Sequence, residues 1–118
     1  MKNYLFVLRK PAHSGAFVQE MLDIILTTAA FDQRVSLLLL DDGVFQLKSG
    51  QQPEHSAYKD TAAIFNALEM YDVTAIYTEA ESLAERGLVA GDLFLPVEVL
   101  DRRAIAEFMR EFEVVFSG

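Results

Sequence analysis

VTAIYTEAESLAERGL, residues 73–88, is the stretch that decides the fold, because it joins a predicted strand to a predicted helix. Residues 73–77 are rich in β-branched and aromatic side chains, which favour a strand. Residues 82–86 are predicted to form a short helix, and Gly87 suits the left-handed position that follows a helix. A strand that leads into a helix is the repeating unit of a parallel sheet.

The alternation of strand and helix continues on both sides of this stretch. Residues 4–8 form an unbroken apolar run, which is typical of a strand covered on both faces. Pro96 removes a hydrogen-bond donor, so its strand should be short, offset or at an edge of the sheet. We expect strands at residues 4–8, 35–40, 73–77, 94–99 and 113–116, and helices at residues 16–31, 57–71, 82–86 and 101–110. This order predicts a single α/β domain over residues 1–118, with a mostly parallel five-stranded sheet and helices on both faces.

The composition agrees with one packed domain. The chain has 118 residues, and 52% of them are hydrophobic, which is above the usual apolar share of globular chains. This excess fits either a deeply buried parallel sheet or apolar surface in a subunit interface, and the two explanations are compatible. If the chain is a subunit, we expect it to self-associate or behave poorly when purified alone.

Charge and cysteine content exclude several classes of protein. The net charge is -8 and the few basic residues form no long run, so we expect no direct binding to nucleic acid. The chain has no cysteine, hence no disulfide framework and no Cys/His zinc pattern. The first apolar run ends at Arg9 and Lys10 and is too short to span a membrane. We therefore expect a cytoplasmic protein without a metal site and without membrane contact.

In a sheet of this kind, binding sites gather at the carboxyl ends of the strands. Here these ends are residues 9–15, 41–46 and 78–81. The first of them lacks the glycine pattern of a dinucleotide or P-loop site, so we expect no nucleotide cofactor. His13 lies there, and histidine is the side chain whose ordinary pKa lies nearest neutral pH, but the pattern favours a solvated loop residue over a catalytic base. The same holds for His55.

The junction at residues 78–81 is predicted to carry permanent negative charge. Thr78 and Glu81 fit a capping box, in which a Thr side chain and a Glu side chain satisfy the first free amides of a helix. A second acid, Glu79, also lies in this first turn, so the junction should repel a thiolate, a persulfide or a phosphate. The two acids are too close in sequence to face each other across a substrate, as the paired carboxylates of a glycosidase do.

Residues 41–47, DDGVFQL, allow two interpretations that the sequence leaves open. Either they form a turn whose apolar residues fold back on the core, or they form a loop that presents Phe45 to a partner, since aromatic residues are enriched in interfaces. We expect the second, with Phe45 outside the core of its own chain. The predicted partner interface comprises Asp42, Gly43, Phe45, Gln46 and Leu47.

Several of these strings together resemble the DsrE/DsrF-like family of small sulfur-relay subunits, and most of all its TusC/DsrF branch. The resemblance runs collinearly over nearly the whole chain. The matching strings are DGVFQL at residues 42–47, Gly50-Gln51 with Pro53, Tyr71-Asp72, Ser82-Leu83 and ERGL at residues 85–88, with Phe6-Val7 and His13 upstream.

The resemblance implies a function that composition does not. In this family, TusB-like, TusC-like and TusD-like subunits form a hetero-oligomer that passes persulfide sulfur toward 2-thiolation of the tRNA wobble uridine. DsrE-like, DsrF-like and DsrH-like subunits act in sulfur oxidation. The reactive cysteine lies at a strand–helix junction, and collinear counting puts Glu79 at that position here.

The sequence therefore favours a non-catalytic TusC-like subunit in a cytoplasmic complex with TusB-like and TusD-like partners. A DsrF-like subunit in sulfur oxidation, with DsrH-like and DsrE-like partners, is the alternative within the family. Two further hypotheses come from other classes of protein. One is a stand-alone domain that binds a small ligand around His13 and Asp42, and the other is an enzyme with His13 as its base.

Overall fold

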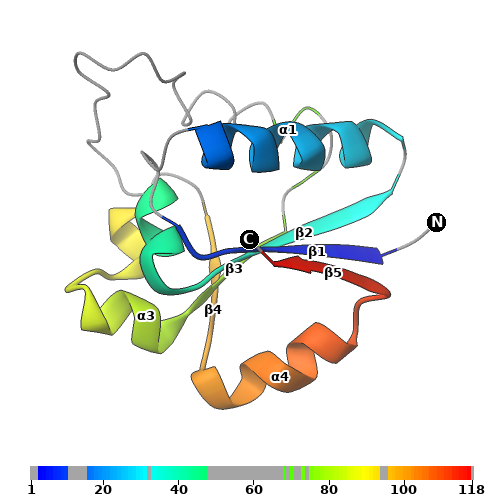
Figure 1. The fold of residues 1–118 in the computed structure, drawn as a ribbon. Coiled ribbons are helices and arrows are strands. Elements are labelled where there is room, and N and C mark those ends of the chain that lie inside the picture. Colours follow the sequence, from blue (N-terminus) through cyan, green and yellow to red (C-terminus); the bar gives the residue numbers. More distant parts are fainter. Residues whose placement is uncertain are drawn as a thin grey trace, which may run out of the picture.

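Five parallel strands form one sheet at the centre of the computed structural model (Figure 1). The structure describes residues 3–10, 16–31, 33–47, 68, 70, 73, 75–93 and 96–117. The strands are β1 (Asn3–Leu8), β2 (Arg34–Leu39), β3 (Ala75–Glu79), β4 (Glu98–Leu100) and β5 (Val114–Ser117). Their order across the sheet is β4-β3-β2-β1-β5, so β4 and β5 are the edge strands. The predicted α/β class is confirmed, and every strand pair is parallel.

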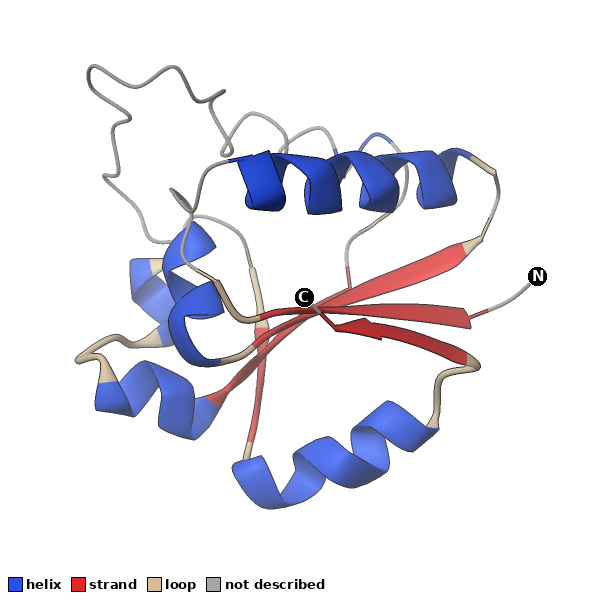
Figure 2. Ribbon diagram, viewed as in Figure 1, coloured by secondary structure: helices blue, strands red, loops and turns tan. Residues whose placement is uncertain are grey.

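Helices cover both faces of this sheet, as Figure 2 shows. Helix α1 (Ala16–Ala30) lies over one face, α4 (Arg102–Arg110) lies over the other, and α3 (Ala80–Glu85) directly follows β3. Two short 3-10 helices, η1 (Asp41–Leu47) and η3 (Ala90–Asp92), complete the described elements. Within these described elements, no helix has the length and apolar character needed to cross a membrane.

The side chains of β1 show why the strands need cover on both faces. Successive residues of a strand point to opposite faces of a sheet. Phe6 belongs to the core cluster under α1, with Leu22 and Ile25 of that helix. Leu5 belongs to the cluster under α4, with Ile105. An unbroken apolar run is therefore what this central strand requires.

The end of α3 follows the predicted pattern. Gly87 has a φ of 68°, the left-handed conformation that glycine adopts without steric cost. The Leu88 amide donates to the Leu83 carbonyl at 2.9 Å, and the Gly87 amide donates to the Ala84 carbonyl at 3.1 Å. These two bonds form a Schellman motif, and the buried Leu83 and Leu88 supply its apolar contact.

Three expectations about the elements need correction or fall outside the described residues. Residues 41–47 form η1 rather than an open loop. The strand expected at residues 94–99 is β4, which begins at Glu98, so Pro96 precedes it. β4 is nevertheless short and at an edge, as Pro96 predicted. The helix expected at residues 57–71 lies outside the described residues, apart from Leu68 and Met70.

Candidate functional site

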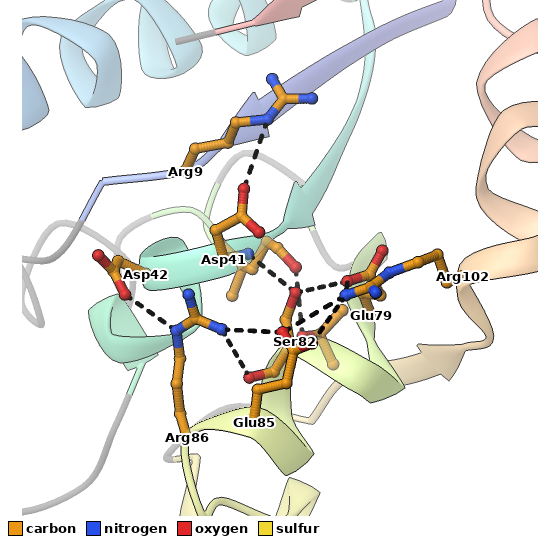
Figure 3. Close-up of polar contacts among 10 residues, drawn as sticks. Arg9, Asp41, Asp42, Glu79, Ser82, Glu85, Arg86 and Arg102 are labelled. Atoms are coloured by element: carbon orange, nitrogen blue, oxygen red, sulfur yellow. Dashed lines mark hydrogen bonds and ion pairs between the residues drawn. The ribbon is translucent and has the colours of Figure 1, made fainter.

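Charged side chains gather at the carboxyl ends of β1, β2 and β3, where a parallel sheet usually places its sites (Figure 3). Arg9 follows β1, Asp41 begins η1 just after β2, and Glu79 is the last residue of β3. Helix α3 adds side chains from the same end. The residues that Figure 3 labels are Arg9, Asp41, Asp42, Glu79, Ser82, Glu85, Arg86 and Arg102.

Glu79 is the buried centre of this group. Its relative accessibility is 6%, although it carries a carboxylate. The Ser82 hydroxyl donates to Glu79 Oε1 at 2.6 Å, and Arg102 Nη2 donates to the same oxygen at 3.0 Å. A buried carboxylate is costly unless hydrogen bonds and a countercharge compensate it, and this one has both.

These contacts decide the protonation state of Glu79. Burial alone raises the pKa of its carboxyl group, because it disfavours the charged form. The hydrogen bonds from Arg102 and Ser82, together with the positive charges of Arg102 and Arg86, outweigh burial and lower that pKa below its ordinary value. Glu79 is therefore an anion at neutral pH and a poor proton acceptor for general-base chemistry.

Ser82 connects this anion to the next strand end. Its hydroxyl is fully buried and accepts a hydrogen bond from the Asp41 amide at 2.9 Å while donating to Glu79. Asp41 has a φ of 52°, a left-handed conformation that is uncommon outside glycine but tolerated by aspartate. The Ser82 hydroxyl thus fixes the turn from β2 into η1 against the start of α3.

Arg86 forms a second connection between α3 and η1. Its Nε donates to Asp42 Oδ1 at 2.9 Å, and its Nη1 donates to the Ser82 carbonyl at 3.1 Å. The Arg86 side chain is only 20% exposed, so the guanidinium is held partly out of water. Asp42, a predicted interface residue, is thereby engaged within its own chain.

The first turn of α3 corrects the predicted capping box. Thr78 lies inside β3, and its hydroxyl donates to the Leu39 carbonyl at 3.3 Å instead of capping the helix. Glu79 is the N-cap residue of α3, without a side-chain cap bond. The Glu81 carboxylate accepts from the Arg102 amide at 2.9 Å, so it caps α4 and not its own helix. β3 ends at Glu79, two residues later than the expected end at residue 77, so the N-cap of the helix that follows is also later than expected.

Gly43 and Phe45 bring η1 close to the sheet. A Cβ atom on Gly43 would lie 1.9 Å from the Leu8 carbonyl oxygen, so only glycine fits at this approach. Phe45 is partly buried and packs against the core cluster under α1. The expectation that Phe45 stays outside the core of its chain is therefore wrong. Its contact with a partner, and that of Asp42, Gly43, Gln46 and Leu47, stays a prediction.

Sequence reasoning found Glu79 but missed the residues that hold it. Ser82 lies in α3 and Arg86 is the C-cap residue of that helix, four positions later, a spacing that places them on a common face. Arg102 had no local signal, because it reaches Glu79 from 23 positions away. His13 and His55 lie outside the described residues. Among the residues that the structure does describe, no three His, Cys, Asp or Glu side chains are grouped to hold a metal ion.

Comparison with known proteins gives a consistent result. The DsrE/DsrF-like family matches residues 2–117. A TusC homolog of Pseudomonas aeruginosa is 42% identical over 116 residues, and the alignment covers 98% of this chain and 98% of the homolog. The intracellular sulfur oxidation protein DsrF of Allochromatium vinosum is 34% identical over 131 aligned positions, which cover 99% of this chain and 96% of DsrF. The crystal structure of the ychN protein of Escherichia coli aligns over the whole of both chains with a TM-score of 0.84 at 16% identity, a likeness of fold.

Proposed function

This chain belongs to the DsrE/DsrF-like family, and we propose that it works as a non-catalytic subunit of a sulfur-relay complex. The names of two relatives, a TusC homolog and the sulfur oxidation protein DsrF, support a role in sulfur metabolism. Both relatives match nearly end to end, so the whole of this domain corresponds to the whole of theirs.

One observation carries the non-catalytic part of the proposal. Persulfide chemistry needs a thiolate as its nucleophile, and this chain contains no cysteine. At the strand–helix junction, where the resemblance places the reactive cysteine of related subunits, the chain has Glu79. That carboxylate is buried, ionised and bound by Ser82 and Arg102. A side chain held in this way supports the neighbouring backbone and offers no atom that can carry sulfur.

We further propose that the cargo is destined for the wobble uridine of tRNA, with TusB-like and TusD-like subunits as partners in the cytoplasm. The higher identity to the TusC homolog than to DsrF supports this choice. A net charge of -8 argues that contact with tRNA goes through another component of the relay. A role in sulfur oxidation beside DsrE-like and DsrH-like subunits is the alternative.

Reconstitution with radiolabelled cysteine and a cysteine desulfurase tests the proposal. We expect label that a thiol reductant releases to appear on the TusD-like subunit and not on this chain. Omission of this chain should lower transfer to the TusD-like subunit and its acceptor. Reductant-labile label on this chain, or transfer that is unchanged without it, would contradict the proposal. Loss of 2-thiouridine in a strain that lacks the chain would separate tRNA thiolation from sulfur oxidation.

A further inference from the structure

The two edges of the sheet differ in how well they are protected. An exposed edge strand presents unpaired backbone groups, and proteins usually guard such edges with charges, proline, short strands or bulges. β4 spans three residues, carries Glu98 and follows Pro96, so it has three of these protections. β5 reads Val-Val-Phe-Ser over residues 114–117 and contains neither a charge nor a proline. β5 is itself only four residues long, but among the described residues it is the less protected of the two edges.

β5 also exposes apolar surface on both of its faces. Val115 pairs with Leu5, which lies in the core cluster under α4, so Val115 points to the α4 face. Phe116 pairs with Phe6 and stacks on its ring at a centroid distance of 5.2 Å, on the α1 face. The two residues are nevertheless 42% and 45% exposed. Such apolar exposure along an open edge is typical of an interface.

The charges at the two ends of β5 are opposite. Glu113 immediately precedes the strand and is exposed. At the other end, the Arg9 guanidinium donates a hydrogen bond to the Ser117 hydroxyl and its Nε lies 3.9 Å from Asp41 Oδ2, yet the Arg9 side chain is still 42% exposed. In an antiparallel pair of identical strands, the beginning of one strand faces the end of the other. A second β5 would therefore set each Glu113 beside the Arg9 of the other copy.

We propose that β5 pairs antiparallel with β5 of a second copy of this chain about a two-fold axis through Val115. The register follows from geometry, because residues directly opposite each other on antiparallel strands point to the same face. With Val115 opposite itself, Phe116 faces Val114 of the other copy, and Glu113 faces Ser117 and Arg9. The interface is self-complementary, as a two-fold dimer requires. The two sheets then join into one ten-stranded sheet.

The dimer should be weak, because a short edge strand buries little surface and small interfaces belong to transient complexes. The net charge of -8 on each copy also opposes association at low ionic strength. Analytical ultracentrifugation at physiological salt, from about 1 to 500 μM protein, tests the proposal. We expect a reversible monomer–dimer equilibrium in the micromolar range.

Matched variants decide whether β5 is the contact. Val115→Lys places two like charges opposite each other on the axis and should weaken the dimer at least about tenfold. Val99→Lys on β4 is the control, because Val99 is 43% exposed on the opposite edge. This control should leave the dimer unchanged, and both variants should keep the thermal midpoint of the parent chain. Glu113→Arg or Arg9→Glu alone should weaken the dimer, and the two changes combined in one chain should restore it.

Three results would overturn the proposal: a monomer over the whole concentration range, equal weakening by Val99→Lys and Val115→Lys, or a combined charge swap that fails to restore the dimer. If the chain is monomeric alone and Val115→Lys instead abolishes binding to a TusB-like or TusD-like subunit, the β5 edge belongs to that partner. This experiment uses no sulfur chemistry, so its outcome is independent of the proposed role in sulfur relay.

Discussion

Ser82 Oγ lies 2.6 Å from Glu79 Oε1 and, on its other side, accepts the backbone amide of Asp41. One hydroxyl thus joins the end of β3, the start of α3 and the start of η1. In this chain, the junction that corresponds to the sulfur-carrying position is therefore filled by polar contacts within the chain. The residues that make these contacts can be tested one by one.

Glu79→Gln should destabilise the fold by about 1.5–3 kcal/mol, the usual range for hydrogen bonds to a charged group. The amide keeps the shape of the side chain but loses the charge that Arg102 and Ser82 stabilise. Urea unfolding measures the change. Glu85→Gln is the control, because that acid is 56% exposed and should change stability by less than about 0.5 kcal/mol. Equal effects of the two substitutions would contradict a special role for Glu79.

The contribution of Glu79 should depend on pH in a defined direction. Its pKa is lowered in the folded chain, so its stabilisation is present above the unfolded carboxyl pKa and is lost as pH falls through the folded one. We expect the free-energy gap between the parent chain and Glu79→Gln to be constant at neutral pH and to shrink as the pH falls below the ordinary glutamate pKa of about 4.3 toward the lower folded pKa. A gap that widens in acid would show that the carboxyl group is stabilised in its neutral form.

Glu79→Cys should give a thiol that reacts slowly despite its favourable charge environment. Arg102 and Ser82 favour an anion at this position, which lowers a thiol pKa. The site is only 6% exposed, however, so a donor molecule has little access to it. The rate of iodoacetamide alkylation against pH gives both the thiol pKa and its accessibility. Fast alkylation together with rapid persulfide uptake would show that the junction remains competent for sulfur.

Gly43→Ala should destabilise the fold by about 1–3 kcal/mol, the usual cost of forcing an extra group into a packed site. The new methyl group would meet the backbone carbonyl of Leu8, which cannot turn aside as a side chain would. Thermal unfolding of the variant checks this. Gly91→Ala is the matched control, since no heavy atom lies within 4 Å of its added Cβ.

Phe45→Ala should cost the fold about 1–3 kcal/mol, less than the 3–5 kcal/mol of a fully buried phenylalanine, because the ring is only partly buried against the core. If the exposed part of the ring also contacts a partner, co-purification with TusB-like and TusD-like subunits should fall as well. Unfolding and co-purification are measured on the same variant. Loss of stability with undisturbed co-purification would remove Phe45 from the proposed interface.

The sequence was sufficient for the sheet but not for the contacts of the site. The apolar run around Phe6 predicted a strand buried on both faces, and Pro96 predicted a short edge strand. Both predictions were possible because each effect is local in the chain. The capping box at Thr78 failed because pairing with β2 extends β3 through that residue, and tertiary pairing overrides a local helix signal. The contact between Arg102 and Glu79 depends on how β4 and α4 pack against the rest of the sheet. The spacing of residues along the sequence does not predict that packing.

Arg102 holds the start of α4 in two ways, through its backbone amide on Glu81 and its guanidinium on Glu79. β4 is only three residues long, so its own ladder gives it little resistance to local opening. Glu79 and Glu81, which lie outside the segment formed by β4 and α4, therefore hold that segment against the rest of the sheet. When Glu79 loses its charge, the amide protons of α4 should exchange with solvent sooner than those of β1 and β2, so that this corner of the molecule opens while the central sheet remains folded.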